Sequence, residues 1–250
     1  MHCNPRPCVV IPARFKSTRF PGKPLTKIRG REMVLRVADL AAGAVELENV
    51  YVATDSLEIS DVVTRAGFKV VITSETCMTG TDRVAEASLG LDYDLFVNVQ
   101  GDEPLVNPSD IQRVIKLKIE YPFHVINGYT EATDDEVNKR SVPKVVMNAE
   151  RELLYASRAV IPGGKEGVAV GVQYFKQVCI YAFSADELEF FFGLKEKGPL
   201  ESIEDIEILR FIECGRKVKM LKCNSGSVAV DYPEDVLSVE KLLMTNDGNL

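Results

Sequence analysis

Short apolar runs alternate with amphipathic stretches along the first 120 residues of the chain. The apolar runs are rich in β-branched side chains and stop at turn-forming residues, which is typical of buried strands. They predict strands near residues 9–11, 49–54, 68–72 and 94–100. The stretches between them have helical spacing and predict helices near 33–41, 56–67, 84–89 and 109–117. This alternation favours right-handed crossovers and a Rossmann-like, mostly parallel α/β sheet with helices on both faces.

The regular alternation stops after residue 120. The sequence predicts a charged loop at 131–139 and strands at 124–129, 142–148, 153–157 and 175–183. We interpret residues 121–200 as a smaller lobe within one domain that spans 1–250. A chain of this length, with 46% hydrophobic residues, suffices for one sizeable core.

The last fifty residues return to a simpler pattern. Ile203, Ile206 and Leu209 have helical spacing, which predicts an amphipathic helix over 201–210 with this stripe facing the core. Late strands are expected at 218–221 and 228–230, and a final helix follows Asp231-Tyr232-Pro233.

Net charge and hydropathy narrow the classes of function. The formal net charge of −7 argues against sequence-independent nucleic-acid binding, because such binding needs a basic face. No run is long enough to span a bilayer, and the first residues lack the apolar segment of a signal peptide. We therefore expect no membrane partner and a cytoplasmic location.

The inventory of reactive side chains is small. The six cysteines show no metal-binding spacing, and the chain has only two histidines and no G-x-S-x-G motif. The chain therefore offers few candidate residues for a Ser-His or Cys-His nucleophilic triad. Catalysis should rest on carboxylates, cations and metal.

A cationic loop follows the first strand. Arg14, Lys16, Arg19 and Lys23 lie in a segment punctuated by Pro and Gly. Ligands of open parallel sheets bind outside the carboxyl ends of the strands, so this loop belongs at a binding site. Its cations and backbone amides can cradle a polyphosphate, whereas the alternative is a solvated surface loop.

Asp102 stands at a position suited to a metal. Asp102 follows the strand at 94–100, in the turn Gly101-Asp102-Glu103-Pro104. Mg²⁺ prefers hard oxygen ligands and is often held by one or two carboxylates together with substrate phosphates. Asp231 precedes the last helix and could simply cap it.

These stretches resemble the signature of the sugar-acid cytidylyltransferases, most closely the 3-deoxy-manno-octulosonate (Kdo) cytidylyltransferase family. The blocks occur in the order typical of that family, from near residue 8 to about residue 243. They are Pro12-Ala13-Arg14, Ser17-Thr18-Arg19, Pro21 to Leu25, Val52 to Asp55, Thr79-Gly80-Thr81-Asp82-Arg83, Asn98 to Pro104, Tyr155 to Arg158, Ile180-Tyr181, Glu204 to Arg210 and Val230 to Asp235.

The resemblance implies a fold of the nucleotide-diphospho-sugar transferase type and attack by the anomeric hydroxyl of a 2-keto-3-deoxy sugar acid on CTP. CMP-sugar and pyrophosphate would result. The implied catalytic residues are Arg14, Lys23, Asp102 and Asp231, with Mg²⁺ on the two aspartates. Whether one or two metal ions bind stays open. The implied nucleotide-binding residues are Ala13, Arg14, Arg19, Lys23, Thr81, Arg83 and Asp102.

The resemblance also implies an acceptor site and a homodimer, with residues 121–200 contributing to both. The implied acceptor-binding residues are Gln100, Arg158, Gln177, Tyr181 and Glu207. The family pattern places Glu204 or Glu207 near the acceptor hydroxyls, and Glu207 is favoured. Arg158 suits the acceptor carboxylate through its bidentate fork. Residues 162–171 could form a lid or merely a surface loop.

One departure from the family pattern concerns the acceptor. Relatives carry His where this chain has Gln177, and Gly where it has Cys179. Gln keeps a hydrogen-bonding end but loses the titratable ring. Three interpretations therefore stay open. The acceptor is Kdo or an amino-Kdo, or it is another acid such as a nonulosonic acid or a phosphonate, or the protein binds nucleotides without catalysing a reaction. A nicotinamide dehydrogenase is disfavoured, because no G-x-G-x-x-G follows the first strand.

Overall fold

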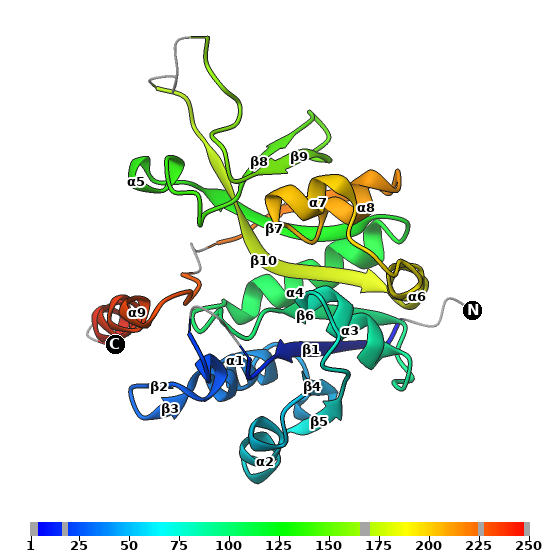
Figure 1. The fold of residues 1–250 in the computed structure, drawn as a ribbon, viewed down its shortest axis with the longest axis vertical. Coiled ribbons are helices and arrows are strands. Elements are labelled where there is room, and N and C mark those ends of the chain that lie inside the picture. Colours follow the sequence, from blue (N-terminus) through cyan, green and yellow to red (C-terminus); the bar gives the residue numbers. More distant parts are fainter. Residues whose placement is uncertain (1–4, 17–19, 166–170, 225–227, 248–250) are drawn as a thin grey trace.

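A single large sheet runs through the molecule (Figure 1). The computed structural model describes residues 5–16, 20–165, 171–224 and 228–247. The strand order along the main path is β11-β7-β10-β6-β1-β4-β5, with β8 and β9 attached beside β10. The strands are β1 Pro7–Ala13, β4 Val50–Thr54, β5 Lys69–Ile72, β6 Leu95–Val99, β7 Val125–Glu131, β8 Lys144–Met147, β9 Leu153–Ser157, β10 Phe175–Ser184 and β11 Val218–Lys222.

The sheet is mostly parallel, as the sequence predicts. β6, β1, β4 and β5 pair in parallel, and β11 pairs in parallel with β7. Only β10 runs against the main path, pairing antiparallel with both β6 and β7 among the described residues. The carboxyl ends of β1, β4, β5 and β6 therefore meet at one edge of the sheet.

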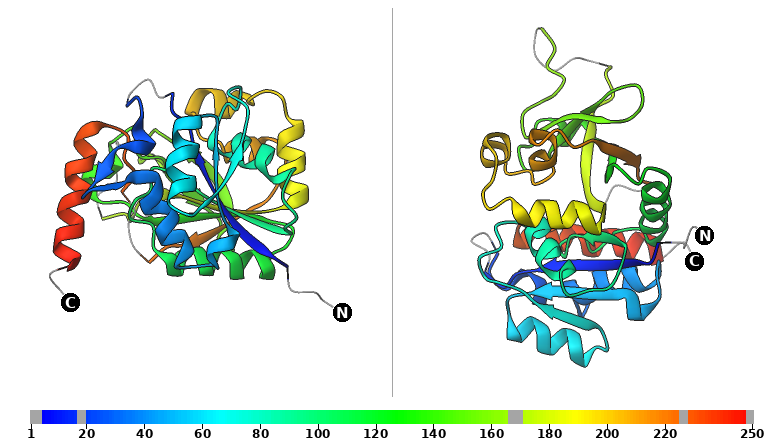
Figure 2. Two further views of the ribbon diagram at one scale, coloured as in Figure 1. Left: turned by 90° about the horizontal axis from the view of Figure 1, so that it is seen from below. Right: turned by 90° about the vertical axis from the view of Figure 1, so that its right-hand side faces the viewer.

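Helices cover both faces of the sheet (Figure 2). The helices are α1 Met33–Ala42, α2 Leu57–Arg65, α3 Gly80–Ser88, α4 Pro108–Glu120, α5 Asp134–Val137, α6 Ala185–Gly193, α7 Pro199–Glu204, α8 Leu209–Glu213 and α9 Pro233–Asp247. Alternate residues of β1 point to opposite sides. Val9 and Ile11 pack with α1, α2 and α4, whereas Cys8 and Val10 pack with α3, α6 and α8. This two-sided burial explains the uninterrupted apolar run of β1.

Short elements complete the carboxyl edge of the sheet. A 3₁₀ turn at Lys23–Leu25 follows Gly22, whose φ of 69° is left-handed. The two-stranded ribbon of β2 (Lys27–Ile28) and β3 (Arg31–Glu32) comes next. The helix α9 lies beside this ribbon in Figure 1 and packs Val239 with Ile28 and Met33. No helix among the described residues is long and apolar enough to cross a membrane.

The irregular middle of the chain forms the hairpin β8/β9 and the long strand β10 (Figure 1). The predicted strands of residues 121–200 are all present, and the expected loop at 131–139 contains the short helix α5. Sequence analysis missed α6, whose Ser184 caps the helix through a reciprocal capping box with Glu187. The proposed lid at 162–171 overlaps residues 166–170, which lie outside the described residues.

Two predictions near the C-terminus are wrong. Residues 201–210 do not form one helix, because Asp205 adopts a left-handed φ of 50° and ends α7. Ile203 is 81% exposed, although Ile206 and Leu209 are buried as expected. Residues 228–230 form no strand, and in the described part of the chain they pair with none.

A close packing contact on β7 predicts a stability effect. A Cβ on Gly128 would lie 2.6 Å from Cγ2 of Ile180 and 2.9 Å from Sγ of Cys223. Gly128→Ala should lower the free energy of unfolding by about 1–3 kcal/mol through overpacking. Thermal or urea denaturation measures this change. Gly193→Ala is the matched control, because a Cβ there meets nothing within 4 Å; equal stability of both variants would contradict the packing.

Candidate active site

Two adjoining cavities open at the carboxyl edge of the sheet. The first cavity lies beside β1, the turn at Lys23 and the start of α3. The second cavity extends from it toward β10, the 139–143 segment and the 205–207 segment. Both are lined by Arg14, Thr79, Gly80, Gln100, Asp102 and Asp231. This is the edge where open α/β sheets bind ligands, so the two cavities form a candidate two-substrate site.

Lys23, Asp102 and Val230 form a junction between three distant segments of the chain. Nζ of Lys23 donates to Oδ2 of Asp102 at 2.6 Å and to the carbonyl of Val230 at 2.8 Å. The backbone amide of Val230 donates to the carbonyl of Asp102 at 2.9 Å. These contacts place Asp231, the next residue, beside Asp102 on the wall of the first cavity.

The two aspartates fit a Mg²⁺ ion that shares its ligands with a substrate. No group of three or more His, Cys, Asp or Glu suited to metal occurs among the described residues. The protein thus offers a pair of hard carboxylates, and phosphate and water oxygens would complete an octahedral shell. Asp235 accepts from the backbone amides of Asp231 and Tyr232 at 2.9 and 2.8 Å, so it serves the start of α9.

The predicted nucleotide-binding residues differ in whether they line a cavity. Ala13 ends β1 and lines the first cavity, and Arg14 lines both cavities. Arg83 also lines the first cavity, but its buried guanidinium is tied to Asp55 by a 3.0 Å ion pair. Thr81 is buried and lines neither cavity. Arg19 lies outside the described residues.

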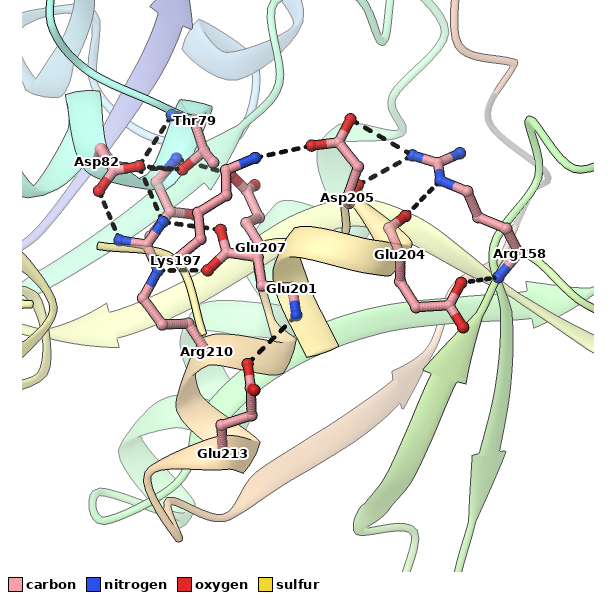
Figure 3. A network of polar contacts seen from close by, with 11 residues as sticks. Thr79, Asp82, Arg158, Lys197, Glu201, Glu204, Asp205, Glu207, Arg210 and Glu213 are labelled. Carbon is pink, nitrogen blue, oxygen red and sulfur yellow. Dashed lines mark hydrogen bonds and ion pairs between the residues drawn. The ribbon is translucent and has the colours of Figure 1, made fainter. Parts of the chain in front are cut away.

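The start of α3 is shaped by a motif that sequence analysis assigned to ligand contact. Thr79 caps the helix and forms a capping box with Asp82. The S/T-x-x-D spacing in Thr79-Gly80-Thr81-Asp82 carries the signal for this cap. Arg210 then pairs with Asp82 at 2.7 Å and with the fully buried Glu201 (Figure 3). This network fixes α7 and α8 against the start of α3.

Glu207 lines the second cavity and orients Gln100, which lines both cavities. Its carboxylate accepts from the amide of Thr81 and from Nε2 of Gln100, each at 2.8 Å. Burial raises the pKa of the Glu207 carboxyl, and hydrogen bonds from Thr81 and Thr79 oppose that rise. Glu207 and Gln100 both line the second cavity, as does the buried Tyr181.

Arg158 lines the second cavity from the end of β9 and is held in a fixed orientation. Its guanidinium donates to the carbonyls of Glu204 and Asp205 (Figure 3) and to the carbonyl of Arg140. Its backbone amide donates to the Glu204 carboxylate at 2.8 Å. Glu204 therefore accepts hydrogen bonds from Arg158 and Ser157 and does not line the second cavity. Of the two glutamates, only Glu207 lines it.

Gln177 lies beside a bulge in β10. The register shifts between Val178 and Tyr181, and Nδ2 of Asn127 donates to the carbonyls of Val178 and Ile180 at 3.0 Å each. Oδ1 of Asn127 is left to accept from Nε2 of Gln177 at 2.9 Å. This contact fixes the orientation of the Gln177 amide, and both Gln177 and Cys179 line the second cavity.

Sequence analysis missed part of the second cavity. Lys139, Glu136 and Lys176 line it, and Lys176 forms an ion pair with Glu136. Glu136 and Lys139 fall in the stretch expected to be a charged loop, where solvated side chains are the ordinary expectation. Only the pairing of β10 with β7 and β8 brings these residues to the site.

The fold and the two cavities define an α/β nucleotide-binding enzyme that joins two substrates at the carboxyl edge of its sheet. The sequence pattern of the cytidylyltransferases matches residues 8–218. The chain belongs to the cytidylyltransferase family.

Named relatives agree with this family. The chain is 40% identical over 244 residues to a 3-deoxy-manno-octulosonate cytidylyltransferase of Myxococcus xanthus, covering 97% of this chain and 98% of that one. It is 39% identical to an 8-amino-3,8-dideoxy-manno-octulosonate cytidylyltransferase of Shewanella oneidensis, covering 94% and 97%. Its fold resembles a CMP:2-keto-3-deoxy-manno-octonic acid synthetase complexed with CTP, with a TM-score of 0.88, 31% identity and coverage of 96% and 99%.

The contact between Gly80 and Gln100 predicts an effect on activity. A Cβ on Gly80 would lie 2.3 Å from Nε2 of Gln100, so Gly80→Ala must push the Gln100 amide away from Glu207. We expect a turnover at least about tenfold lower, since ångström-scale misplacement in a site costs up to about 100-fold. The melting temperature should change little, because only a flexible side chain moves.

Steady-state kinetics and thermal denaturation measure the two effects of Gly80→Ala. Gly90→Ala is the control, because its Cβ would meet only the Ala87 carbonyl, at 3.9 Å. Wild-type turnover in the Gly80 variant would show that the position of Gln100 does not matter.

Proposed function

We propose that this enzyme transfers the cytidylyl group of CTP to the anomeric hydroxyl of a 2-keto-3-deoxy sugar acid, Kdo or a close relative, and releases pyrophosphate. The observation that carries the proposal is the pair of cavities joined at Asp102 and Gln100. One cavity offers cations and carboxylates for a metal-bound triphosphate, and the other offers a fixed Arg beside amides and a hydroxyl. The relatives that span nearly the whole chain are named for such acceptors.

In the first cavity, Arg14 and Lys23 bind the β- and γ-phosphates. Charge-assisted contacts of this type are stronger than neutral ones. Lys23 is bonded to Asp102 and to the Val230 carbonyl, and in this proposal it exchanges the carboxylate for a phosphate oxygen when CTP binds. The exchange frees Asp102 at the moment when the anionic substrate arrives. Arg19 is proposed for the same role from the family pattern, and Thr81 and Arg83 for nucleotide contact.

Asp102 and Asp231 are the residues proposed to hold Mg²⁺. When bound, such an ion neutralises charge on the α-phosphate and lowers the pKa of the attacking hydroxyl. The protein contributes positioning and fixed charges, which dominate catalysis of phosphoryl-type transfer.

In the second cavity, Arg158 is proposed to bind the acceptor carboxylate. Three of its five N–H donors go to backbone carbonyls, which leaves two for a ligand. Gln100, Gln177, Tyr181 and Glu207 supply polar groups for the hydroxyls. Because Glu207 already accepts from Thr81 and Gln100, its carboxylate is oriented before the acceptor binds.

Three further expectations belong to this proposal. Residues 1–250 act as one cytidylyltransferase domain, in which 121–200 provide much of the acceptor side. The same lobe supports a homodimer. The enzyme works in the cytoplasm. Light scattering of the purified protein tests the dimer.

Pyrophosphate release tests the proposed reaction. CTP and Mg²⁺ are supplied with Kdo, 8-amino-Kdo, a nonulosonic acid or a small phosphonate in turn. Release with Kdo or 8-amino-Kdo supports the proposal and identifies the preferred acceptor. Release with another acid alone would overturn the acceptor class. Silence with every acceptor, in protein that still binds CTP, would indicate a nucleotide-binding protein without this activity.

Loss of the Asp102 charge should abolish turnover. Asp102→Asn hardly changes volume but removes an anionic ligand and the partner of Lys23. We expect turnover to fall by about 100-fold or more, a size typical for loss of a group that stabilises transition-state charge. Circular dichroism should show an intact fold.

Asp39→Asn is the matched control for Asp102→Asn. It breaks the ion pair with Arg31, which lies outside both cavities. That variant should keep wild-type turnover. Near-normal turnover of Asp102→Asn with Mg²⁺ would refute the assignment of Asp102.

Gln177 should govern the choice of acceptor. Gln177→His replaces an amide held by Asn127 with a ring that can carry a proton, so the polarity of the second cavity changes. The ratio of kcat/KM between two acceptors should shift about tenfold, the size of one hydrogen-bond difference, while the KM for CTP stays within about twofold. Gln173→His is the control, because Gln173 is absent from the lining of both cavities. Equal effects on CTP and acceptor would contradict the placement of Gln177.

A further inference from the structure

Lys144, the first residue of β8, is fully buried, and no carboxylate accepts a hydrogen bond from it. Its Nζ instead donates to three backbone carbonyls, those of Lys139, Val142 and Arg158, at 2.9, 2.7 and 3.0 Å. These bonds use all three N–H donors of the ammonium. Burying a charged group without a counter-ion lowers the stability of the folded state. The buried Lys144 ammonium therefore calls for an explanation other than packing.

The three carbonyls belong to two walls of the second cavity. Lys139 and Val142 come from the 139–143 segment, and Arg158 follows β9. Pro143, the residue before Lys144, accepts from the backbone amide of Gln177 at 2.9 Å. Lys144 therefore ties together the segments that carry Arg158 and Gln177.

The ammonium also adds to a cluster of positive charge. Burial lowers the pKa of Lys144, and the nearby Arg158 and Arg140 lower it further, whereas Glu204 raises it. Glu204 is engaged by Ser157 and by the Arg158 amide. Asp205 forms a 4.0 Å ion pair with Arg158 and also pairs with Lys197. Further carboxylates line the second cavity, namely those of Asp102, Glu103, Glu136, Glu207, Asp231 and Asp235. The end beside Lys144 and Arg158 is therefore where an anionic group of the acceptor is favoured.

We infer that Lys144 is a positioning residue for the acceptor, which holds Arg158 and the 139–143 segment in place for an acidic group. The inference rests on the proposed function and adds a residue that is not among the proposed acceptor-binding residues. Lys144 is absent from the lining of both cavities, so it acts through Arg158 and the segment that it holds. Its loss should affect one substrate only.

The test is Lys144→Met, which keeps the length of the side chain and removes the charge and the donors. The KM for the acceptor should rise at least tenfold at saturating CTP, while the KM for CTP stays within twofold. Lys144→Arg keeps the charge and should recover part of the loss. A merely structural role would change both KM values together, or neither.

Lys118→Met is the matched control. Lys118 is also buried and also donates to two carbonyls, those of Pro122 and His124, but it pairs with Glu187 and lines neither cavity. We expect a lower melting temperature and wild-type KM values for both substrates. An equal rise of acceptor KM in the Lys118 and Lys144 variants would overturn the inference.

CTP binding by calorimetry reports whether each variant is folded. If Lys144→Met does not bind CTP, Lys144→Gln takes its place with the same expectation. Failure of both neutral variants to bind CTP, with Lys118→Met still competent, would make Lys144 a folding residue and refute the inference.

The inference and the proposed function fail in different ways. Every acceptor in the panel carries a carboxylate or a phosphonate, so the effect of Lys144 is measured with whichever acid the wild-type enzyme turns over. Wild-type activity with a nonulosonic acid alone, combined with a selective rise of its KM in Lys144→Met, refutes the Kdo-type acceptor and supports the inference. No turnover with any acid refutes both.

Discussion

The ion pair between Lys23 and Asp102 is the contact on which the geometry of the site depends. It joins the loop after β1 to the turn after β6, and the Val230 carbonyl and amide add the arm that carries Asp231. Both side chains are shielded, with 16% and 28% exposure, so the attraction is stronger than that of a surface pair. Two parallel neighbours in the sheet, β1 and β6, set the spacing of this pair. The sheet thus brings a cation and a carboxylate of the first cavity within hydrogen-bond distance.

The break between α7 and α8 organises one side of the second cavity. In one continuous helix, Glu204 and Glu207 would lie on the same face, because residues three apart are neighbours. The left-handed Asp205 turns the chain, so that Glu204 reaches Ser157 and Arg158 while Glu207 reaches Thr81 and Gln100. Arg210, beyond the break, pairs with Asp82 and so fixes the segment to α3 (Figure 3). The segment thereby contributes Asp205, Ile206 and Glu207 to the second cavity, and Glu207 also orients Gln100, which lines both cavities.

The sequence predicts the α/β half of the fold well, because strands buried on both faces and amphipathic helices carry strong periodic signals. The capped helix after Ser56 and the helix that ends at Gly43 are examples, since local hydrogen bonds decide them. The helix predicted over 201–210 fails for the opposite reason. Its apolar spacing is helical, but the break at Asp205 is accompanied by Arg158, a residue distant in sequence that bonds the last carbonyls of α7.

In the candidate site, too, some residues can be predicted from the sequence and others cannot. Residues at strand ends, such as Ala13 and Asp102, are predictable because the sheet fixes their position. The strands at 142–148 and 153–157 are predictable as a pair around a turn, and β8 and β9 form that pair. The neighbours of Arg158 and Gln177 also depend on how β8 pairs with β10, and the sequence carries no local signal for that pairing. Lys144 is the clearest case of a residue whose surroundings cannot be predicted from the sequence. In the sequence it is one lysine in a strand, and only the fold reveals three carbonyls around its ammonium.

The most direct test of this account is a crystal structure of the protein with CTP, Mg²⁺ and an unreactive analogue of the acceptor. We expect the triphosphate to lie in the first cavity, with Lys23 bonded to a phosphate oxygen instead of Asp102. The acidic group of the analogue should lie against Arg158 in the second cavity. A triphosphate bound elsewhere, with the Lys23–Asp102 pair intact, would contradict the central claim that this junction is where the two substrates meet.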